Sequence, residues 1–157
     1  MNFDVQKIME KISPVPGIDI VIWYRRGYPV CQVSVNDSFD SMNIDPNGKV
    51  FTNFLDIFFD CLHKHKFDYH FVFDIHQMSN LSTQLIVQFM TKLNEYRELI
   101  DKYLLSTSLI VESQTMKQLF DCAFFILPNR KPVNVFMTDE IKKMKVFMKE
   151  CNPQSKI

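Results

Sequence analysis

The chain has 157 residues, of which 46% are hydrophobic and 23% charged, and its 18 basic side chains balance its 18 acidic ones. This length and composition suit one globular domain with a real core, which excludes disordered, collagen-like and coiled-coil proteins. Only 3 Gly stand against 15 Phe and 9 Met, so a glycine-rich phosphate loop is excluded as well. The bias toward Phe, Ile, Lys, Asn and Met is typical of an AT-rich genome, such as that of a large DNA virus.

The first 36 residues predict a short helix followed by a hairpin. Apolar residues recur at helical spacing over residues 1–12, and two prolines and a glycine then end that helix by residue 17. Residues 18–24 and 29–35 are rich in β-branched and aromatic side chains and flank the turn at 25–27, as in two antiparallel strands. Residues 36–48 are polar and end in a strong turn signal, Asp-Pro-Asn-Gly.

Beyond this turn, helical and strand patterns alternate. The predicted elements are helix 51–62, strand 69–75, a helix capped by one of the polar residues 79, 80, 82 and 83 with an apolar side that reaches residue 100, strand 103–111, a helix from 113 or 115 to 127, strand 133–137 and a closing helix. Thr138 is expected to cap this last helix, with Asp139 and Glu140 as its first-turn acids. Crossovers of this length require parallel pairing with right-handed connections. We therefore expect a single α/β domain: a mixed, mostly parallel sheet with an N-terminal antiparallel hairpin and helices packed on it.

In this order of elements, residues 18–151 resemble a STAS domain, the fold of anti-sigma-factor antagonists. Besides the order, two segments carry the resemblance: the strand HFVFDI before a polar loop and helix, and the strand and helix SLIVESQTMKQLFDCAFFIL. Residues 1–17 form an N-terminal helix and linker in this interpretation, and residues 152–157 form a C-terminal tail. The resemblance implies a module that binds partner proteins without catalysis.

The resemblance also assigns candidate residues near the end of the strand HFVFDI. Asp74 matches the acid that the family has at the strand end, and Thr83, or Ser82 one place earlier, falls on the family's phosphorylated hydroxyl. The phosphorylation signature is degenerate, because Ser82 stands where the family has aspartate and Leu85 where it has glycine.

The same segment is a candidate anion site on physical grounds. A strand end followed by a helix start presents unpaired N–H groups and the positive end of the helix dipole. The candidates for a ligand, a phosphate or phosphorylation are Asp74, His76, Ser79, Ser82 and Thr83. Ordinary helix capping is the alternative, since it needs only one of the hydroxyls.

Neither the histidines nor the cysteines predict a metal site, a cofactor or a catalytic residue. His63 and His65 point to different sides of a helix, and no cysteine pair has metal-ligand spacing. We expect solvated or capping histidines, with His76 alone retained as a site candidate, and core-facing thiols at Cys61 and Cys122. Reduced cysteines, the mixed polar start of the chain and the lack of a long apolar run predict an intracellular protein, cytoplasmic or nuclear, neither secreted nor membrane-spanning.

Two further regions are candidates for interaction. The closing helix carries a stripe of Lys142, Lys145 and Lys149, which either is a solvated face or meets an acidic partner, an anionic membrane or nucleic acid. Nucleic acid is the less expected partner, because the chain as a whole is neutral. The hairpin carries aromatic and basic side chains suited to protein contacts and to a homodimer: Trp23, Tyr24, Arg25, Arg26 and Tyr28.

The sequence therefore predicts a non-catalytic protein–protein interaction or regulatory module, with an unidentified protein partner and a homodimer as one arrangement. The alternative is a protein or enzyme that binds a small anion or nucleotide in the crevice at the carboxyl ends of the central strands.

Overall fold

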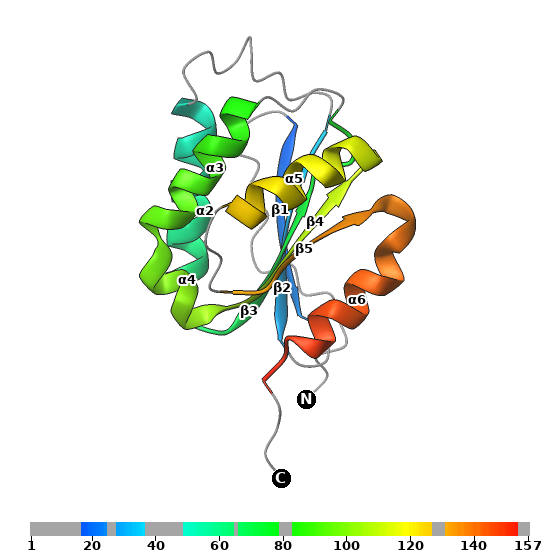
Figure 1. Cartoon of the computed structure of the whole chain (residues 1–157). Coiled ribbons are helices and arrows are strands. Elements are labelled where there is room, and N and C mark those ends of the chain that lie inside the picture. Colours follow the sequence, from blue (N-terminus) through cyan, green and yellow to red (C-terminus); the bar gives the residue numbers. More distant parts are fainter. Residues whose placement is uncertain are drawn as a thin grey trace.

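The computed structural model describes residues 17–24, 28–36, 49–64, 66–78, 83–126 and 131–153 (Figure 1). The predicted helix at 1–12 and most of the loop at 36–48 lie outside these residues. So do four candidate site residues: Arg25, Arg26, Ser79 and Ser82.

The described strands form one mixed sheet of five strands in the order β1-β2-β3-β4-β5. They are β1 (Ile18–Tyr24), β2 (Pro29–Val35), β3 (Tyr69–Asp74), β4 (Leu104–Val111) and β5 (Val133–Met137). β1 pairs antiparallel with β2, and every later pair is parallel. The predicted α/β fold, with its hairpin and mostly parallel sheet, is confirmed.

The helices cover the two faces of this sheet unequally (Figure 1). They are α2 (Lys49–Lys64), α3 (Thr83–Glu95), α4 (Arg97–Tyr103), α5 (Gln114–Ile126) and α6 (Ile141–Glu150), the last preceded by the 3-10 turn η1 (Thr138–Glu140). Helices α2 to α5 share one apolar core with the sheet, whereas α6 packs on the opposite face in a second, smaller core. Strands added in sequence with right-handed crossovers place the crossover helices on one face.

Aromatic stacking dominates the larger core. Phe89 of α3 lies 4.9 Å from the ring of Phe73 on β3, and Phe58 of α2 lies 5.3 Å from Phe71 on the same strand. Phe71 and Phe73 are two residues apart, so the pleat of β3 directs both rings to this face. Phenylalanine rings thus hold both α2 and α3 to the sheet.

Two predicted helix boundaries are wrong. The helix expected to reach residue 100 breaks at Tyr96, whose backbone angles (φ −95°, ψ 16°) leave the helical region, and Tyr103 ends α4 instead of starting a strand. The Tyr96 ring stacks on Phe59 at 4.9 Å, and its hydroxyl donates to Asp56 of α2. These tertiary contacts hold the break at a position where the local apolar pattern continues.

The predicted cap of the closing helix is also wrong. Thr138 makes no capping hydrogen bond, and a 3-10 turn precedes α6. The carboxylate of Glu140 instead accepts a hydrogen bond from the backbone N–H of Met137 at 2.9 Å. The longer Glu140 side chain reaches back over the turn and takes the role expected of the threonine hydroxyl.

The predicted burial of Cys122 and the predicted exposure of His63 are both wrong. Cys122 is exposed, because α5 turns Phe120 toward the sheet and a residue two places later lies on the opposite side of a helix. His63 is buried, with its ring stacked on Phe59 at 5.7 Å and its Nε2 hydrogen-bonded with the Tyr69 hydroxyl at 3.0 Å. Burial lowers the pKa of His63. In the described residues, no helix has the length and apolar character needed to cross a bilayer.

Candidate functional site

Two of the residues predicted at the strand end, Asp74 and His76, lie in contact with each other. Asp74 ends β3, and its carboxylate contacts Nδ1 of His76 and accepts the His76 backbone N–H at 3.2 Å. The His76 side chain is 33% exposed and that of Asp74 only 14%, so a shielded carboxylate orients an accessible imidazole at the carboxyl edge of the sheet. Thr83 is the first residue of α3, and its neighbours Ser79 and Ser82 lie outside the described residues.

The other border of the predicted strand-end crevice shows ordinary helix capping. The hydroxyl of Ser113 accepts a hydrogen bond from the Met116 backbone N–H at 3.2 Å, and the Ser113 carbonyl accepts one from Lys117 N–H. Of the two helix starts predicted, Ser113 is thus the capping residue of α5. The Ser113 hydroxyl already caps the helix, so the accessible titratable groups in the described part of this crevice are those of His76 and Glu112.

A polar cluster fastens the end of α6 to the sheet. His70 of β3 is 4% exposed; its Nδ1 lies 2.7 Å from the Ser106 hydroxyl of β4, and its Nε2 lies 2.5 Å from Oδ1 of Asn152, just after α6. A carbonyl oxygen only accepts, so Nε2–H donates to Asn152 and Nδ1 accepts from Ser106. Burial lowers the pKa of His70, and the bond to Asn152 partly opposes that shift. Burial thus favours the neutral form of this imidazole.

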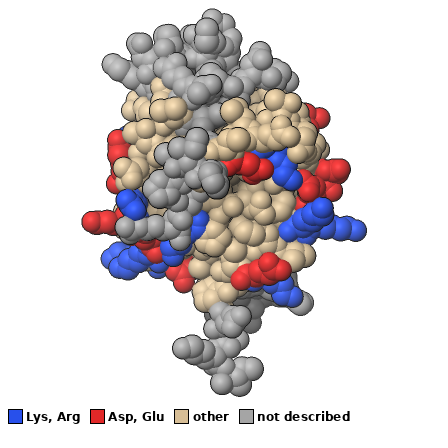
Figure 2. Space-filling model, viewed as in Figure 1, with Lys and Arg blue, Asp and Glu red and all other residues tan. Residues whose placement is uncertain are grey.

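An open groove of about 470 Å³ lies between β5 and α6. Its apolar lining comes from Val135 and Phe136 of β5 and from Val146 and Phe147 of α6. The rings of Phe136 and Phe147 are 5.7 Å apart, and Val146 is 56% exposed. Figure 2 shows an area without charged side chains over β5 and α6, with acidic and basic side chains around it. The charged residues that line the groove are Lys117, Glu140, Lys142, Lys143 and Glu150.

Side chains of β5 and of the turn after it occupy two of the outward N–H groups on the edge of β5 beside this groove. Thr107 of β4 donates its N–H to the Pro132 carbonyl, which places the N–H groups of Val135 and Met137 on the outer edge of β5. Oδ1 of Asn134 accepts the Val135 N–H at 2.9 Å, and Glu140 accepts that of Met137 at the same distance. Side chains that occupy edge donors protect a sheet against added strands.

Glu140 also pairs with two lysines at the rim of the groove. Lys117 approaches it at 3.3 Å and Lys143 at 3.5 Å. The hydrogen bond from the Met137 backbone, followed by the Lys117 contact, lowers the pKa of Glu140. The acid is thus held as a carboxylate, and the lysines that flank it keep the turn before α6 in place.

The predicted lysine stripe and aromatic hairpin are only partly assembled. Lys142, Lys145 and Lys149 are all exposed, but Lys142 alone of the three lines the groove. Tyr28 lies edge-on to His70, with ring centroids 6.4 Å apart. The side chains of Trp23 and Tyr24 lie outside the described set. A signal for the groove was present in the sequence, since Val146 interrupts the lysine-rich side of the helix.

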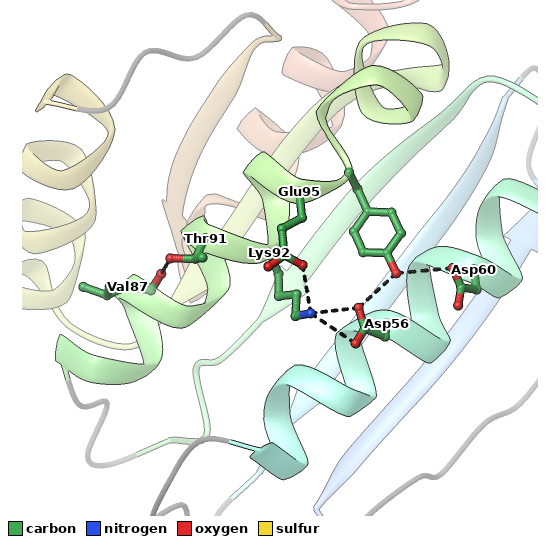
Figure 3. Close-up of polar contacts among 7 residues, drawn as sticks. Asp56, Asp60, Val87, Thr91, Lys92 and Glu95 are labelled. Atoms are coloured by element: carbon green, nitrogen blue, oxygen red, sulfur yellow. Dashed lines mark hydrogen bonds and ion pairs between the residues drawn. The ribbon is translucent and has the colours of Figure 1, made fainter.

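A second polar network joins α2 to α3 on the surface (Figure 3). The Lys92 ammonium lies 2.9 Å from Asp56 and 2.9 Å from Glu95, and the Tyr96 hydroxyl donates to Asp56 and Asp60. Burial and the two carboxylates raise the pKa of Tyr96, and hydrogen bonds to Glu95 and Asp56 raise that of Lys92. Every member has a partner inside the network, which suits a structural clasp between the helices.

Within the described ranges, no three His, Cys, Asp or Glu side chains gather as metal ligands. Comparison with protein-family models, with curated proteins and with solved structures gives no match to this chain.

Proposed function

We propose that the chain is a non-catalytic protein-interaction or regulatory module of the STAS type, and that it docks its partner in the groove between β5 and α6. The order of elements and the mixed sheet support the STAS-like assignment. The single observation that carries the docking function is the groove itself, where an exposed valine and two aromatic rings lie inside a charged rim. An apolar centre with a polar rim is the usual anatomy of a protein interface.

The partner is held by side chains and not by an added strand. Asn134 and Glu140 occupy the outward N–H groups of Val135 and Met137, so an extended peptide would first have to displace them to pair along this part of β5. Val146 and Phe147 remain available for apolar contact, and Lys142 makes no ion pair within the described part of the chain. A helical surface with apolar and acidic residues fits this groove best.

Proximity cross-linking in native extract, followed by mass spectrometry, tests this function. Val146→Asp places a charge in the groove and should abolish capture of the partner. Val87→Asp is the matched control, because Val87 is similarly exposed, at 58%, but lies on α3 away from the groove. Lys142→Glu should weaken capture and Lys145→Glu should not. Equal capture by the two valine variants would refute docking at the groove.

One observation favours a second function, the binding of a small anion or nucleotide at the strand ends. The Asp74 carboxylate orients the imidazole of His76, which is one-third exposed just after the carboxyl end of β3. A thermal-shift screen with inorganic phosphate and ATP tests it, because a ligand that binds the folded state raises the melting temperature by mass action. The shift should disappear in His76→Ala and persist in His63→Gln; no shift with the wild-type chain rejects this function.

A further inference from the structure

We propose that the partner docked in the groove is a second copy of this chain, with its α6 packed antiparallel against α6 of the first. This inference rests on the proposed docking function and adds the identity of the occupant. Five residues of α6 line the groove, and the inference follows from four of them, Lys143, Val146, Phe147 and Glu150, the fifth being Lys142.

The spacing of these four residues makes a helix–helix seam. They lie at positions i, i+3, i+4 and i+7, which share one side of an α-helix over two turns. The two central positions are apolar and the two outer ones are charged, so the seam has an apolar middle and polar ends. Lys145 and Lys149 lie outside this stripe and do not line the groove.

The charges at the two ends select a two-fold, antiparallel arrangement. When two such stripes run antiparallel, Lys143 faces Glu150 of the second copy at both ends, and Val146 faces Phe147 of the second copy in the middle. A parallel arrangement would place Lys143 opposite Lys143 and Glu150 opposite Glu150. Opposite charges across an interface fix orientation, and like charges penalise the alternative. The stripe is thus complementary to itself in one orientation.

The free chain leaves these side chains accessible to a second copy. The side chain of Lys143 is 75% exposed, and its 3.5 Å approach to Glu140 is at the long end of an ion pair. Glu150 is exposed and has no ion-pair partner among the described residues. Lys143 can therefore turn to Glu150 of the second copy, while Lys117 stays with Glu140 at 3.3 Å. Because α6 has only 10 residues, the contact is short and the dimer should dissociate on dilution.

Sedimentation equilibrium of the full chain over a range of concentrations tests the inference. The wild-type chain should show a monomer–dimer equilibrium. Lys143→Glu or Glu150→Lys alone places like charges at both ends and should weaken the dimer about tenfold, whereas the double variant should restore it. Lys145→Glu, a matched charge reversal outside the stripe, should leave the dimer unchanged. Val146→Asp should yield monomers, and circular dichroism should show each variant folded, since all four positions are exposed.

The results separate this inference from the proposed function. A wild-type chain that stays monomeric at all concentrations, or single reversals that the double variant does not rescue, would overturn the second copy as occupant. Cross-linking to a different protein that Val146→Asp abolishes would then leave the docking function standing. A dimer that Val146→Asp leaves intact would overturn the inference independently, because its interface would lie elsewhere on the chain.

Discussion

Replacing Asn152 with alanine should destabilise the fold by freeing the end of α6 from the sheet. Oδ1 of Asn152 accepts the Nε2–H of His70 at 2.5 Å, and His70 is 4% exposed. Alanine removes the acceptor and leaves a buried donor without a partner. Such a group costs about 1–3 kcal/mol. For a domain of this size, each kcal/mol lowers the melting temperature by about 2–4 °C.

The same position should control the response of the fold to acid. Burial lowers the pKa of His70 below its ordinary value of 6.5, so the unfolded chain binds a proton at this site more readily than the folded one. The free energy of unfolding is therefore highest above the unfolded pKa and falls as the pH drops toward the folded pKa. Asn152→Ala removes a contact that raises the pKa of His70, so the free energy of unfolding should fall further in acid than it does for the wild-type chain. Asn152→Asp supplies a carboxylate that favours the imidazolium of His70, so the free energy of unfolding should fall less in acid.

Urea unfolding followed by circular dichroism, at about pH 7.5 and about pH 5, measures both effects. His63 is also buried with a lowered pKa, but it contributes equally to every variant and cancels in the differences. Asn94→Ala, at an exposed position of α3, is the matched control. The reasoning fails if Asn152→Ala unfolds at the same urea concentration as the control, or if Asn152→Asp loses as much stability in acid as the wild-type chain.

Three other substitutions have defined outcomes. Phe89→Ala should cost about 3–5 kcal/mol in urea unfolding, because Phe89 is 2% exposed and stacks on the sheet, whereas Val87→Ala on the exposed side of α3 should cost less than about 0.5 kcal/mol. Tyr69→Phe should lower the free energy of unfolding by about 1–3 kcal/mol, because it removes the hydrogen-bond partner of His63 Nε2 while His63 Nδ1 already lacks one. A change below about 0.5 kcal/mol would contradict this. Cys122→Ser should remove a fast-reacting thiol from titration with a thiol reagent under native conditions, because Cys122 is exposed; unchanged fast labelling would show that another thiol reacts.

The strands could be predicted from the sequence, but the break between α3 and α4 could not. Residues 18–24, 29–35 and 133–137 match the observed strands, because β-branched runs between turn signals need no tertiary information. At the break between these helices, the Tyr96 hydroxyl is hydrogen-bonded to Asp56 and Asp60, 40 and 36 positions earlier in the chain. No local pattern contains that contact.

Part of the candidate site could likewise be predicted from the sequence, and part could not. Asp74 and His76 are two residues apart, so the sequence alone could place them together. The groove needs β5 at the edge of the sheet and α6 on the opposite face from the other helices, and both depend on the global order of strands. His63 was expected in solvent because a histidine near a helix end usually caps it, whereas the aromatic rings of α2 and β3 enclose it.

The unequal covering of the sheet has a consequence for motion. Among the described residues, four helices share the larger core, whereas the smaller one holds α6, through Met144 and the partly buried Ile141, Phe147 and Met148, and polar groups such as His70 and Ser108 interrupt the apolar surface there. A smaller apolar contact favours local opening of α6 over global unfolding. Backbone amides of α6 should therefore exchange with deuterium well before those of β3, and the last helix would open as a separate unit while the rest of the domain stays closed.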